Sequence, residues 1–188
     1  MITAARAACV IGWPIEHSRS PLIHNYWLKR YRIAGEYRRE AVPPNEFRAF
    51  VQSLETRGYV GANVTVPHKE AALAWSQPDD RARMVGAANT LLLDGVLRST
   101  NTDVEGFINH LDASAAGWDA IEEALVLGAG GAAHAVVFGL IERGIGRVVV
   151  ANRTMARGRA LADEFGPKVV PVAWADTRCR SRAPSARE

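Results

Sequence analysis

The sequence predicts an α/β protein built from two successive units in which strands alternate with helices. Short runs typical of strands occur at residues 8–12, 36–42, 61–66, 124–127, 147–151 and 168–172, and all except the charged run at 36–42 are largely apolar. Segments with helical periodicity or capping signals separate them, at residues 20–32, 45–56, 132–143 and 155–165. Each half therefore has the order βαβαβ, which is typical of a parallel sheet with helices packed on it.

Proline and glycine mark the boundaries of elements in the first half. Ser20 can cap a helix whose first turn holds Pro21, because proline is tolerated where the N–H has no helical partner. Gly58 is placed to end the second helix, since glycine favours the left-handed conformation found there. Pro67 predicts the start of a further helix that runs through Trp75.

The region after this helix predicts another helix, a hairpin and a linker. Pro78 and the two aspartates after it begin a helix that ends near Gly86. Asp94-Gly95 predicts a two-residue turn between strands at 88–93 and 96–99. A helix at 102–113 and a linker at 115–119 follow. We therefore expect a first domain at residues 1–114, an incomplete second domain at 120–176 and a basic tail at 177–188.

Charge argues against a nucleic-acid partner. The formal net charge is +3, but four of the 23 basic residues and only one of the 20 acidic residues lie after residue 176. The rest of the chain is neutral, and a nucleic-acid surface needs a basic patch. No stretch is apolar and long enough to span a membrane, and no secretion signal is evident. We expect a cytoplasmic protein that binds neither nucleic acid nor membrane.

Metal binding is not indicated either. Cys9 and Cys179 are the only cysteines, which suggests neither a disulfide framework nor a metal cluster and fits a reducing compartment. The histidines show no metal-ligand spacing, and we expect them in loops or on helix surfaces. They are His17, His24, His68, His110 and His134.

A glycine-rich turn opens the second unit and predicts a dinucleotide site. Gly128-Ala129-Gly130-Gly131-Ala132-Ala133 fits the pattern G-x-G-x-x-G/A, after a strand and at the start of a helix. Missing side chains let the main chain approach a pyrophosphate, which the helix N-terminus attracts. The fold expected for this half is therefore a partial Rossmann-type domain. A glycine turn that binds nothing is the alternative.

The second strand of this unit indicates NADP as the cofactor. NAD sites place an acidic residue about 20 residues beyond the glycine turn, to bind the ribose hydroxyls. Here the chain has Asn152, Arg153 and Thr154, with Arg157 one helical turn later. Guanidinium groups suit a 2′-phosphate and offer no acceptor to a free hydroxyl. Solvated arginines at a helix start are the alternative.

Four motifs precede the linker, and with the two nucleotide motifs they resemble the shikimate dehydrogenase family. The resemblance runs from about Val10 to Asp176. The motifs are Gly12-Trp13-Pro14-Ile15-Glu16-His17-Ser18-Arg19-Ser20-Pro21, Asn63-Val64-Thr65-Val66-Pro67-His68-Lys69, Gly86-Ala87-Ala88-Asn89-Thr90-Leu91 and Asn101-Thr102-Asp103-Val104-Glu105-Gly106.

The resemblance implies an N-terminal α/β substrate domain followed by an NADP domain. It implies the reversible NADPH-dependent reduction of 3-dehydroshikimate to shikimate, a step towards chorismate and the aromatic amino acids. It also implies that Ser18 and Ser20 hold the substrate carboxylate and that Thr65 and Asn89 bind ring hydroxyls. Lys69 and Asp103 would form the catalytic pair and also contact the substrate.

Each of these residues has a purely structural alternative. Lys69 could be an exposed surface lysine, the usual location of lysine. Asp103 could simply begin a helix, where an acidic side chain is stabilising. Ser18 and Ser20 could be a loop hydroxyl and an N-cap.

The sequence departs from the family at its end. Family members are longer, and residues 177–188 have neither apolar periodicity nor a family motif, as in a truncated or frameshifted chain. Without later strands, Ala124 to Leu127 would form an unpaired edge. We therefore expect the chain to associate through that edge, with a homodimer as one such state, or to hold its second half loosely. We also expect its dehydrogenase activity to be strongly impaired.

Two rival functions stay open at this stage. A quinate/shikimate dehydrogenase that uses NAD is the closer one, although Arg153 and Arg157 argue against it. A non-catalytic ligand-binding fragment is the other.

Overall fold

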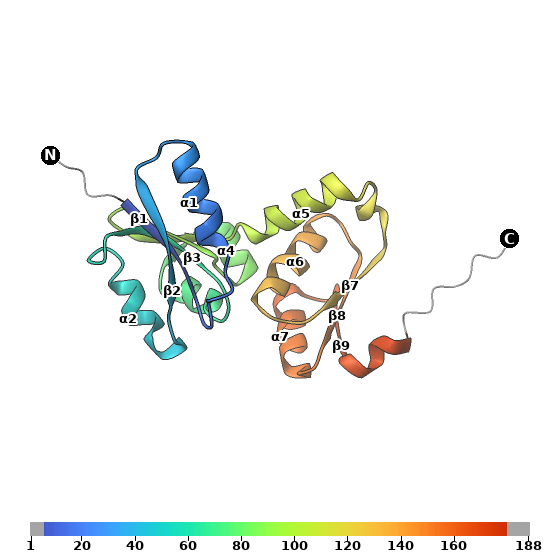
Figure 1. Cartoon of the computed structure of the whole chain (residues 1–188). Helices are drawn as coiled ribbons and strands as arrows, with labels where there is room; N and C mark the ends of the chain where they lie inside the picture. Colours follow the sequence, from blue (N-terminus) through green and yellow to red (C-terminus); the bar gives the residue numbers. More distant parts are fainter. Residues whose placement is uncertain (1–5, 180–188) are drawn as a thin grey trace. The chain divides into compact units, whose positions relative to one another are not determined.

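The computed structural model describes residues 6–179 of the chain. The chain divides after Thr102 into two compact units, which are described separately (Figure 1). Both units are α/β, as expected. No helix in the described part of the chain is long and apolar enough to cross a membrane.

The first unit contains a six-stranded mixed sheet in the order β2-β1-β3-β5-β6-β4. The first three strands along the chain are parallel, as the βαβαβ pattern predicts. β5 lies antiparallel to β3 and to β6, and the short strand β4 lies parallel to β6. The strands are β1 (Arg6–Gly12), β2 (Gly35–Ala41), β3 (Tyr59–Val64), β4 (Gln77–Pro78), β5 (Thr90–Leu93) and β6 (Leu97–Thr100).

Four short helices accompany this sheet. They are α1 (Ser20–Arg30), α2 (Phe47–Gln52), α3 (Lys69–Ala74) and α4 (Asp80–Val85). Phe47 and Leu54 pack with Ile11, Val64 and Leu91 of the strands in one core, and each of the five is at most 3% exposed. This packing fixes the ends of β1 and β3, from which the loops carrying the expected site residues depart.

Two local predictions in this unit are wrong. Pro67 does not begin a helix, because it lies in the turn after β3 and α3 starts at Lys69. The hairpin turn has three residues rather than two, because Leu93 pairs with Leu97. Gly95 has φ 86° whereas Asp94 does not enter the positive-φ region that a two-residue type I′ turn requires of both central residues.

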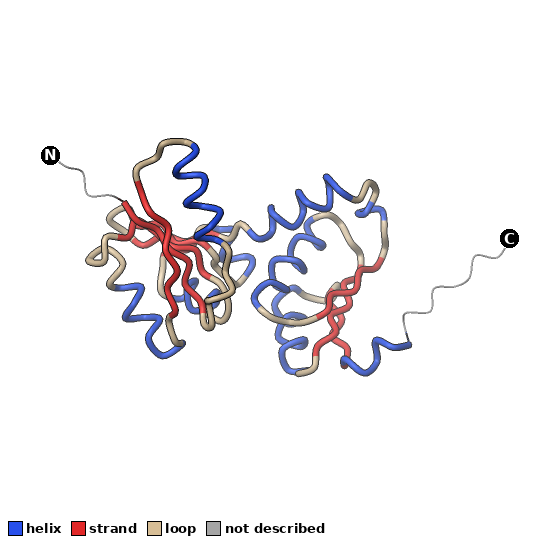
Figure 2. Tube along the Cα trace, in the orientation of Figure 1, coloured by secondary structure: helices blue, strands red, loops and turns tan. Residues whose placement is uncertain are grey.

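The second unit contains a parallel sheet in the order β7-β8-β9, with a Rossmann-like alternation of strands and helices. Figure 1 shows α6 and α7 on the same side of this sheet, and Figure 2 shows the three strands side by side. A 3-10 helix at Trp174–Cys179 follows the last strand. The elements are α5 (Asp103–Ser114), β7 (Glu123–Leu127), α6 (Gly131–Glu142), β8 (Arg147–Asn152), α7 (Met155–Phe165) and β9 (Val169–Ala173).

Helix α5 is grouped with the second unit, whereas the sequence placed it at the end of the first domain. It packs on α6, where a Cβ added to Gly139 would lie 3.1 Å from atoms of Ile108. Phe107 also packs against the core of the second unit. The two compact units therefore meet after residue 102, whereas the sequence analysis placed the domain boundary after residue 114. Most of the expected basic tail, from residue 180 onward, lies outside the described residues.

Candidate active site

The ends of two adjacent parallel strands bring together the loops that carry most of the expected site residues. Ile11 of β1 lies beside Val64 of β3. The N–H of Thr65 donates to the carbonyl of Ile11 at 2.9 Å, and the N–H of Trp13 donates to the carbonyl of Val66 at 3.0 Å. The β1–α1 and β3–α3 loops therefore run side by side at one edge of the sheet.

Gly12 permits this close approach. A Cβ at this position would lie 2.6 Å from Cδ1 of Ile15 and 2.7 Å from Cγ2 of Thr65. Both distances are shorter than van der Waals contact, so a side chain at this position would force the side chains of Ile15 and Thr65 to move.

The two serines lie in the first of these loops and at the start of α1. Ser20 is the first residue of α1 rather than the residue before it, and no side chain caps that helix. The Ser18 hydroxyl lies 3.3 Å from the Ser20 hydroxyl, and Nη2 of Arg39 donates to the Ser18 carbonyl at 2.7 Å. The N-cap alternative for Ser20 is therefore not observed, and both hydroxyls are half-buried at the sheet edge.

Asn89 joins the same edge from the start of β5. Its carbonyl accepts the N–H of Val64 at 2.7 Å, and the side chain is 8% exposed. Oδ1 of Asn89 accepts hydrogen bonds from the Thr90 hydroxyl at 2.9 Å and from the N–H of Thr102 at 3.1 Å. Lys69 begins α3 half-buried, and its carbonyl accepts the N–H of Ala88 at 2.9 Å.

The structure thus gathers five of the six expected substrate residues at one sheet edge of the first unit. They are Ser18, Ser20, Thr65, Lys69 and Asn89. The sixth, Asp103, follows Thr102 and begins α5 of the second unit. Its pairing with Lys69 stays a prediction.

His68 lies in the loop between β3 and α3, one of the two expected locations for the histidines, but its ring is buried. It is 2% exposed, its ring stacks on Phe47 with centroids 4.6 Å apart, and Nε2 lies 2.7 Å from the carbonyl of Val42. Burial lowers the pKa of His68, partly offset by the hydrogen bond to Val42. The turn that ends at Pro67 directs this ring into the core, which periodicity could not show. Within residues 6–179, no cluster of three His, Cys, Asp or Glu side chains is placed to hold a metal ion.

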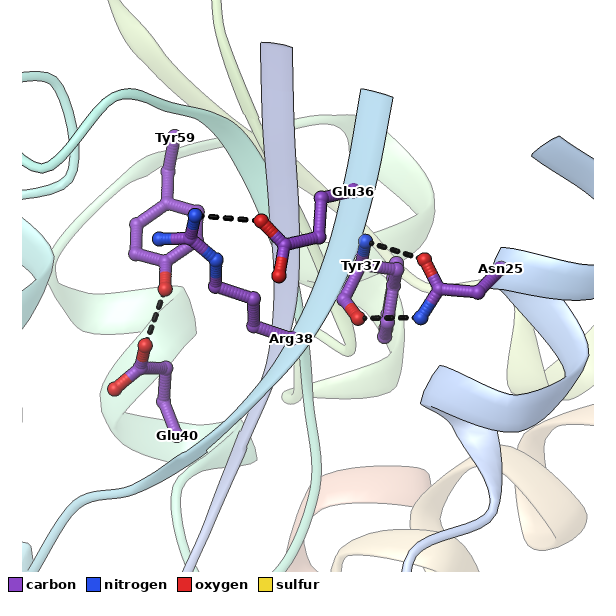
Figure 3. Close-up of polar contacts among 6 residues, drawn as sticks. All are labelled: Asn25, Glu36, Tyr37, Arg38, Glu40 and Tyr59. Atoms are coloured by element: carbon purple, nitrogen blue, oxygen red, sulfur yellow. Dashed lines mark hydrogen bonds and ion pairs between the residues drawn. The ribbon is translucent and has the colours of Figure 1, made fainter. Parts of the chain in front are cut away.

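The sequence did not predict a set of hydrogen-bonded polar residues within the strands that end at this edge. The Tyr37 hydroxyl donates to Oδ1 of Asn63 at 2.6 Å, and Nδ2 of Asn63 donates to the Thr90 hydroxyl at 3.3 Å. Tyr37 is itself held by Asn25 of α1 (Figure 3). Two signals were available: Asn63 lies in a quoted motif, and Tyr37 is the one aromatic residue in the charged strand β2.

The other face of β2 is polar and exposed. Nη2 of Arg38 lies 2.6 Å from a carboxylate oxygen of Glu36, and this hydrogen bond lowers the pKa of Glu36 (Figure 3). The Arg38 guanidinium also lies 5.9 Å from the centre of the Tyr59 ring, and the Tyr59 hydroxyl donates to Glu40. Tyr37 is the only buried residue of β2.

The glycine turn of the second unit follows β7 and precedes α6. Gly128 has φ 107°, a conformation that favours glycine, and its N–H donates to the carbonyl of Ala151 at 2.8 Å. Gly130 has an ordinary φ of −102°, and a Cβ there would meet no protein atom within 4 Å. Neither backbone conformation nor packing within the described residues therefore requires glycine at 130. Its small size instead leaves space at the N-terminus of α6.

The basic residues expected at the cofactor lie next to this turn. Leu127 of β7 is in register with Ala151 of β8, so the segment after β8 begins beside the glycine turn. Nδ2 of Asn152 donates to the carbonyl of Thr154 at 2.8 Å, which shapes the turn into α7. Arg153 and Arg157 are both exposed.

Comparison with known proteins also divides the chain into two parts. Residues 10–91 match the shikimate dehydrogenase substrate binding domain, and residues 115–179 match the shikimate / quinate 5-dehydrogenase family. A shikimate dehydrogenase (NADP(+)) of Rhodopseudomonas palustris strain TIE-1 is 64% identical over 177 residues. That of Nitrobacter winogradskyi is 65% identical over 173 residues. The chain belongs to the shikimate dehydrogenase family.

The alignments cover unequal shares of the two sequences. They include 94% and 92% of this chain but only 64% and 62% of the two relatives, respectively. The chain therefore spans less than two thirds of the length of these shikimate dehydrogenases.

Solved structures of the family share the fold. The shikimate 5-dehydrogenase of Thermus thermophilus, in complex with NADP(H) and shikimate, has a TM-score of 0.77 at 38% identity, over 89% of this chain and 62% of that one. The quinate dehydrogenase of Corynebacterium glutamicum, in complex with NAD, has a TM-score of 0.79 at 27% identity, over 90% of this chain and 64% of that one. Fold similarity alone therefore does not separate shikimate from quinate dehydrogenases in this family.

Proposed function

We propose that this chain carries the catalytic and cofactor sites of an NADP-dependent shikimate dehydrogenase. The reaction would be the reversible reduction of 3-dehydroshikimate to shikimate, a step of aromatic amino acid biosynthesis. The observation that carries the proposal is the convergence of five expected substrate residues at one sheet edge. Curated relatives with this name that are about 64% identical to the chain support it.

The chemistry of this edge suits a small hydroxylated acid. The hydroxyls of Ser18 and Ser20 lie 3.3 Å apart, and both can donate to the same carboxylate. Thr65 and Asn89 add a hydroxyl and a carboxamide, groups that can bind ring hydroxyls. Lys69 supplies the only ammonium group among these five residues.

Proton transfer is assigned to Lys69 and Asp103. Oxidation of a ring carbinol removes a hydride from carbon and a proton from the hydroxyl oxygen, so a positioned side chain must accept that proton. NADP, when bound, accepts the hydride. In the proposal Lys69 and Asp103 hold the hydroxyl and move its proton, while the two serines orient the ring through its carboxylate.

The second unit fits the pyrophosphate and the 2′-phosphate of NADP. The space in front of α6 at Gly130 lets main-chain N–H groups approach a pyrophosphate, which the helix N-terminus also attracts. Ala129, Gly131 and Ala132 complete this turn. Arg153, Thr154 and Arg157 lie beside it after β8 and would bind the 2′-phosphate, with Asn152 shaping their turn.

An assay of NADPH formation tests the proposed activity. The purified chain should form NADPH only when both shikimate and NADP are present, at a rate well below that of the Rhodopseudomonas palustris relative. Lys69→Ala should reduce turnover by about 10²–10⁴ while shikimate binding changes little, because proton transfer is lost. Lys29→Ala, on the exposed surface of α1, is the control. Saturable shikimate binding without any NADPH formation would favour the non-catalytic alternative.

The same assay separates the quinate alternative. We expect shikimate with NADP to exceed quinate with NAD as a substrate pair. The reverse order would place the chain with the quinate dehydrogenases.

A further inference from the structure

A continuous series of hydrogen bonds connects β2 to the expected substrate residue Asn89. It runs from the Tyr37 hydroxyl to Oδ1 of Asn63 at 2.6 Å, and from Nδ2 of Asn63 to the Thr90 hydroxyl at 3.3 Å. The Thr90 hydroxyl donates in turn to Oδ1 of Asn89 at 2.9 Å. All these residues belong to the first unit, and Tyr37 and Asn89 are buried.

The direction of every bond in this series follows from its first member. An amide oxygen carries no hydrogen, so the Tyr37 hydroxyl must donate to Oδ1 of Asn63. This contact turns Nδ2 of Asn63 towards Thr90, whose hydroxyl then accepts from Asn63 and keeps its own hydrogen for Asn89. Burial raises the pKa of Tyr37, with a smaller contribution from Cys9, so the phenol keeps its proton.

The series helps to fix which side of the Asn89 carboxamide accepts hydrogen bonds, together with the N–H of Thr102, which can only donate. Oδ1 receives hydrogens from Thr90 and from the N–H of Thr102, while Nδ2 donates to the Thr102 hydroxyl at 3.1 Å. If the amide of Asn63 rotated by 180°, its Nδ2 would face the phenol. The hydroxyl of Thr90 would then have to donate to Asn63 and could no longer donate to Asn89.

We propose that Tyr37 is a positioning residue for the substrate site. It orients Asn63 and, through Thr90, helps to hold Asn89 so that its Nδ2 atom serves as a donor to a ring oxygen of shikimate. The role rests on the proposed function, because Asn89 is a substrate residue only there. Tyr37 acts through Asn63 and needs no contact with the substrate. The main chain of Tyr37 is itself fixed by Asn25, which keeps the phenol in place.

Tyr37→Phe tests this role because it removes the hydroxyl and leaves the ring against His24, 4.1 Å away. Binding of shikimate to the purified chain is measured by calorimetric titration for the wild type and the variant. We expect the dissociation constant to rise about 3- to 10-fold, the effect of one lost hydrogen bond. Tyr26→Phe is the matched control, because Tyr26 lies on the exposed surface of α1 and should leave binding unchanged.

A second measurement reports on orientation directly. The side-chain amide resonances of Asn63 and Asn89 are recorded by ¹H–¹⁵N NMR and assigned with Asn63→Asp and Asn89→Asp. Tyr37→Phe should shift or broaden both pairs of resonances and leave most backbone resonances of the sheet in place. Loss of the whole pattern of backbone resonances would mean that Tyr37 is needed for folding. That result would overturn the positioning role.

The outcomes separate the two claims. Unchanged shikimate binding or unchanged Asn89 amide resonances in Tyr37→Phe overturns the positioning role and leaves the proposed function intact. A wild-type chain that binds no shikimate overturns the proposed function, and the role of Tyr37 with it.

Discussion

The side-chain carboxamide of Asn25 bonds to both main-chain polar groups of Tyr37. Nδ2 of Asn25 donates to the Tyr37 carbonyl at 2.8 Å, and the Tyr37 N–H donates to Oδ1 of Asn25 at 2.9 Å (Figure 3). β2 is an edge strand, so a helix side chain here takes the place of a neighbouring strand. No residue of α1 is buried, which makes this pair an important tie between the helix and the sheet.

Asn25→Ala should therefore destabilise the first unit. Loss of the carboxamide leaves two partly buried main-chain groups to water, which we expect to lower the free energy of unfolding by about 1–2 kcal/mol. Urea denaturation measures this difference. Asn45→Ala is the control, because Asn45 is exposed and precedes α2. Equal stability of the two variants would show that α1 is held by other contacts.

Arg153→Ala should weaken NADP far more than NAD. Only NADP has a 2′-phosphate, and a hydrogen bond to a charged group contributes about 1.5–3 kcal/mol. Dissociation constants for both cofactors measure the difference. Arg147→Ala is the matched control, because Arg147 begins β8 at the opposite end and pairs with Glu123. The phosphate assignment fails if Arg153→Ala weakens both cofactors equally.

Burial of His68 should make the stability of the chain depend on pH. Because burial lowers the pKa of His68 below its ordinary value of 6.5, the unfolded chain takes up a proton at a higher pH than the folded chain does. This contribution to stability is therefore complete above pH 6.5 and decreases as the pH falls below it. His24 has a pKa shifted in the same direction.

The contribution of His68 is measured by comparison with a variant. Urea denaturation from pH 8 to pH 5 should show a smaller decrease in stability for His68→Gln than for the wild type. The exposed His17 provides the control variant His17→Gln, which should retain the wild-type slope. Identical slopes for all three proteins would show that His68 does not titrate differently on folding.

The exposed edge of β7 should make the purified chain prone either to associate with other copies of itself or to unfold locally at β7. Within the described residues β7 pairs only with β8, and Leu125 and Leu127 are 47% and 62% exposed. Size-exclusion chromatography with light scattering should detect association, and hydrogen exchange should detect opening of β7. Leu125→Lys should reduce association, whereas Leu92→Lys on the interior strand β5 should not. A monomer whose β7 amides exchange slowly would contradict this expectation.

Most strands and helices of both units could be predicted from the sequence, because apolar runs and glycine or proline signals coincide there. The glycine turn after β7 and the strand before it illustrate this agreement. Local sequence signals gave a wrong prediction where the same residue type is common in two kinds of structure. Pro67 resembles a helix start, but it lies in a turn that directs His68 into the core.

The remaining features depend on contacts between distant segments. β4 has two residues and is defined by its pairing with β6, so no local pattern could predict it. The link from Tyr37 to Asn63 joins β2 to β3 across 26 positions of sequence. α5 is amphipathic, and only its packing on α6 shows which unit it belongs to.

Titration of the purified chain with shikimate tests the central claim most directly. The sheet edge formed by Ser18, Ser20, Thr65, Lys69 and Asn89 should give saturable binding of shikimate at one site. Replacing both serines with alanine should weaken this binding by at least about tenfold, because two hydroxyl donors to the carboxylate are lost. Binding that is absent in the wild type, or unchanged in the double variant, would contradict the assignment of this edge as the substrate site.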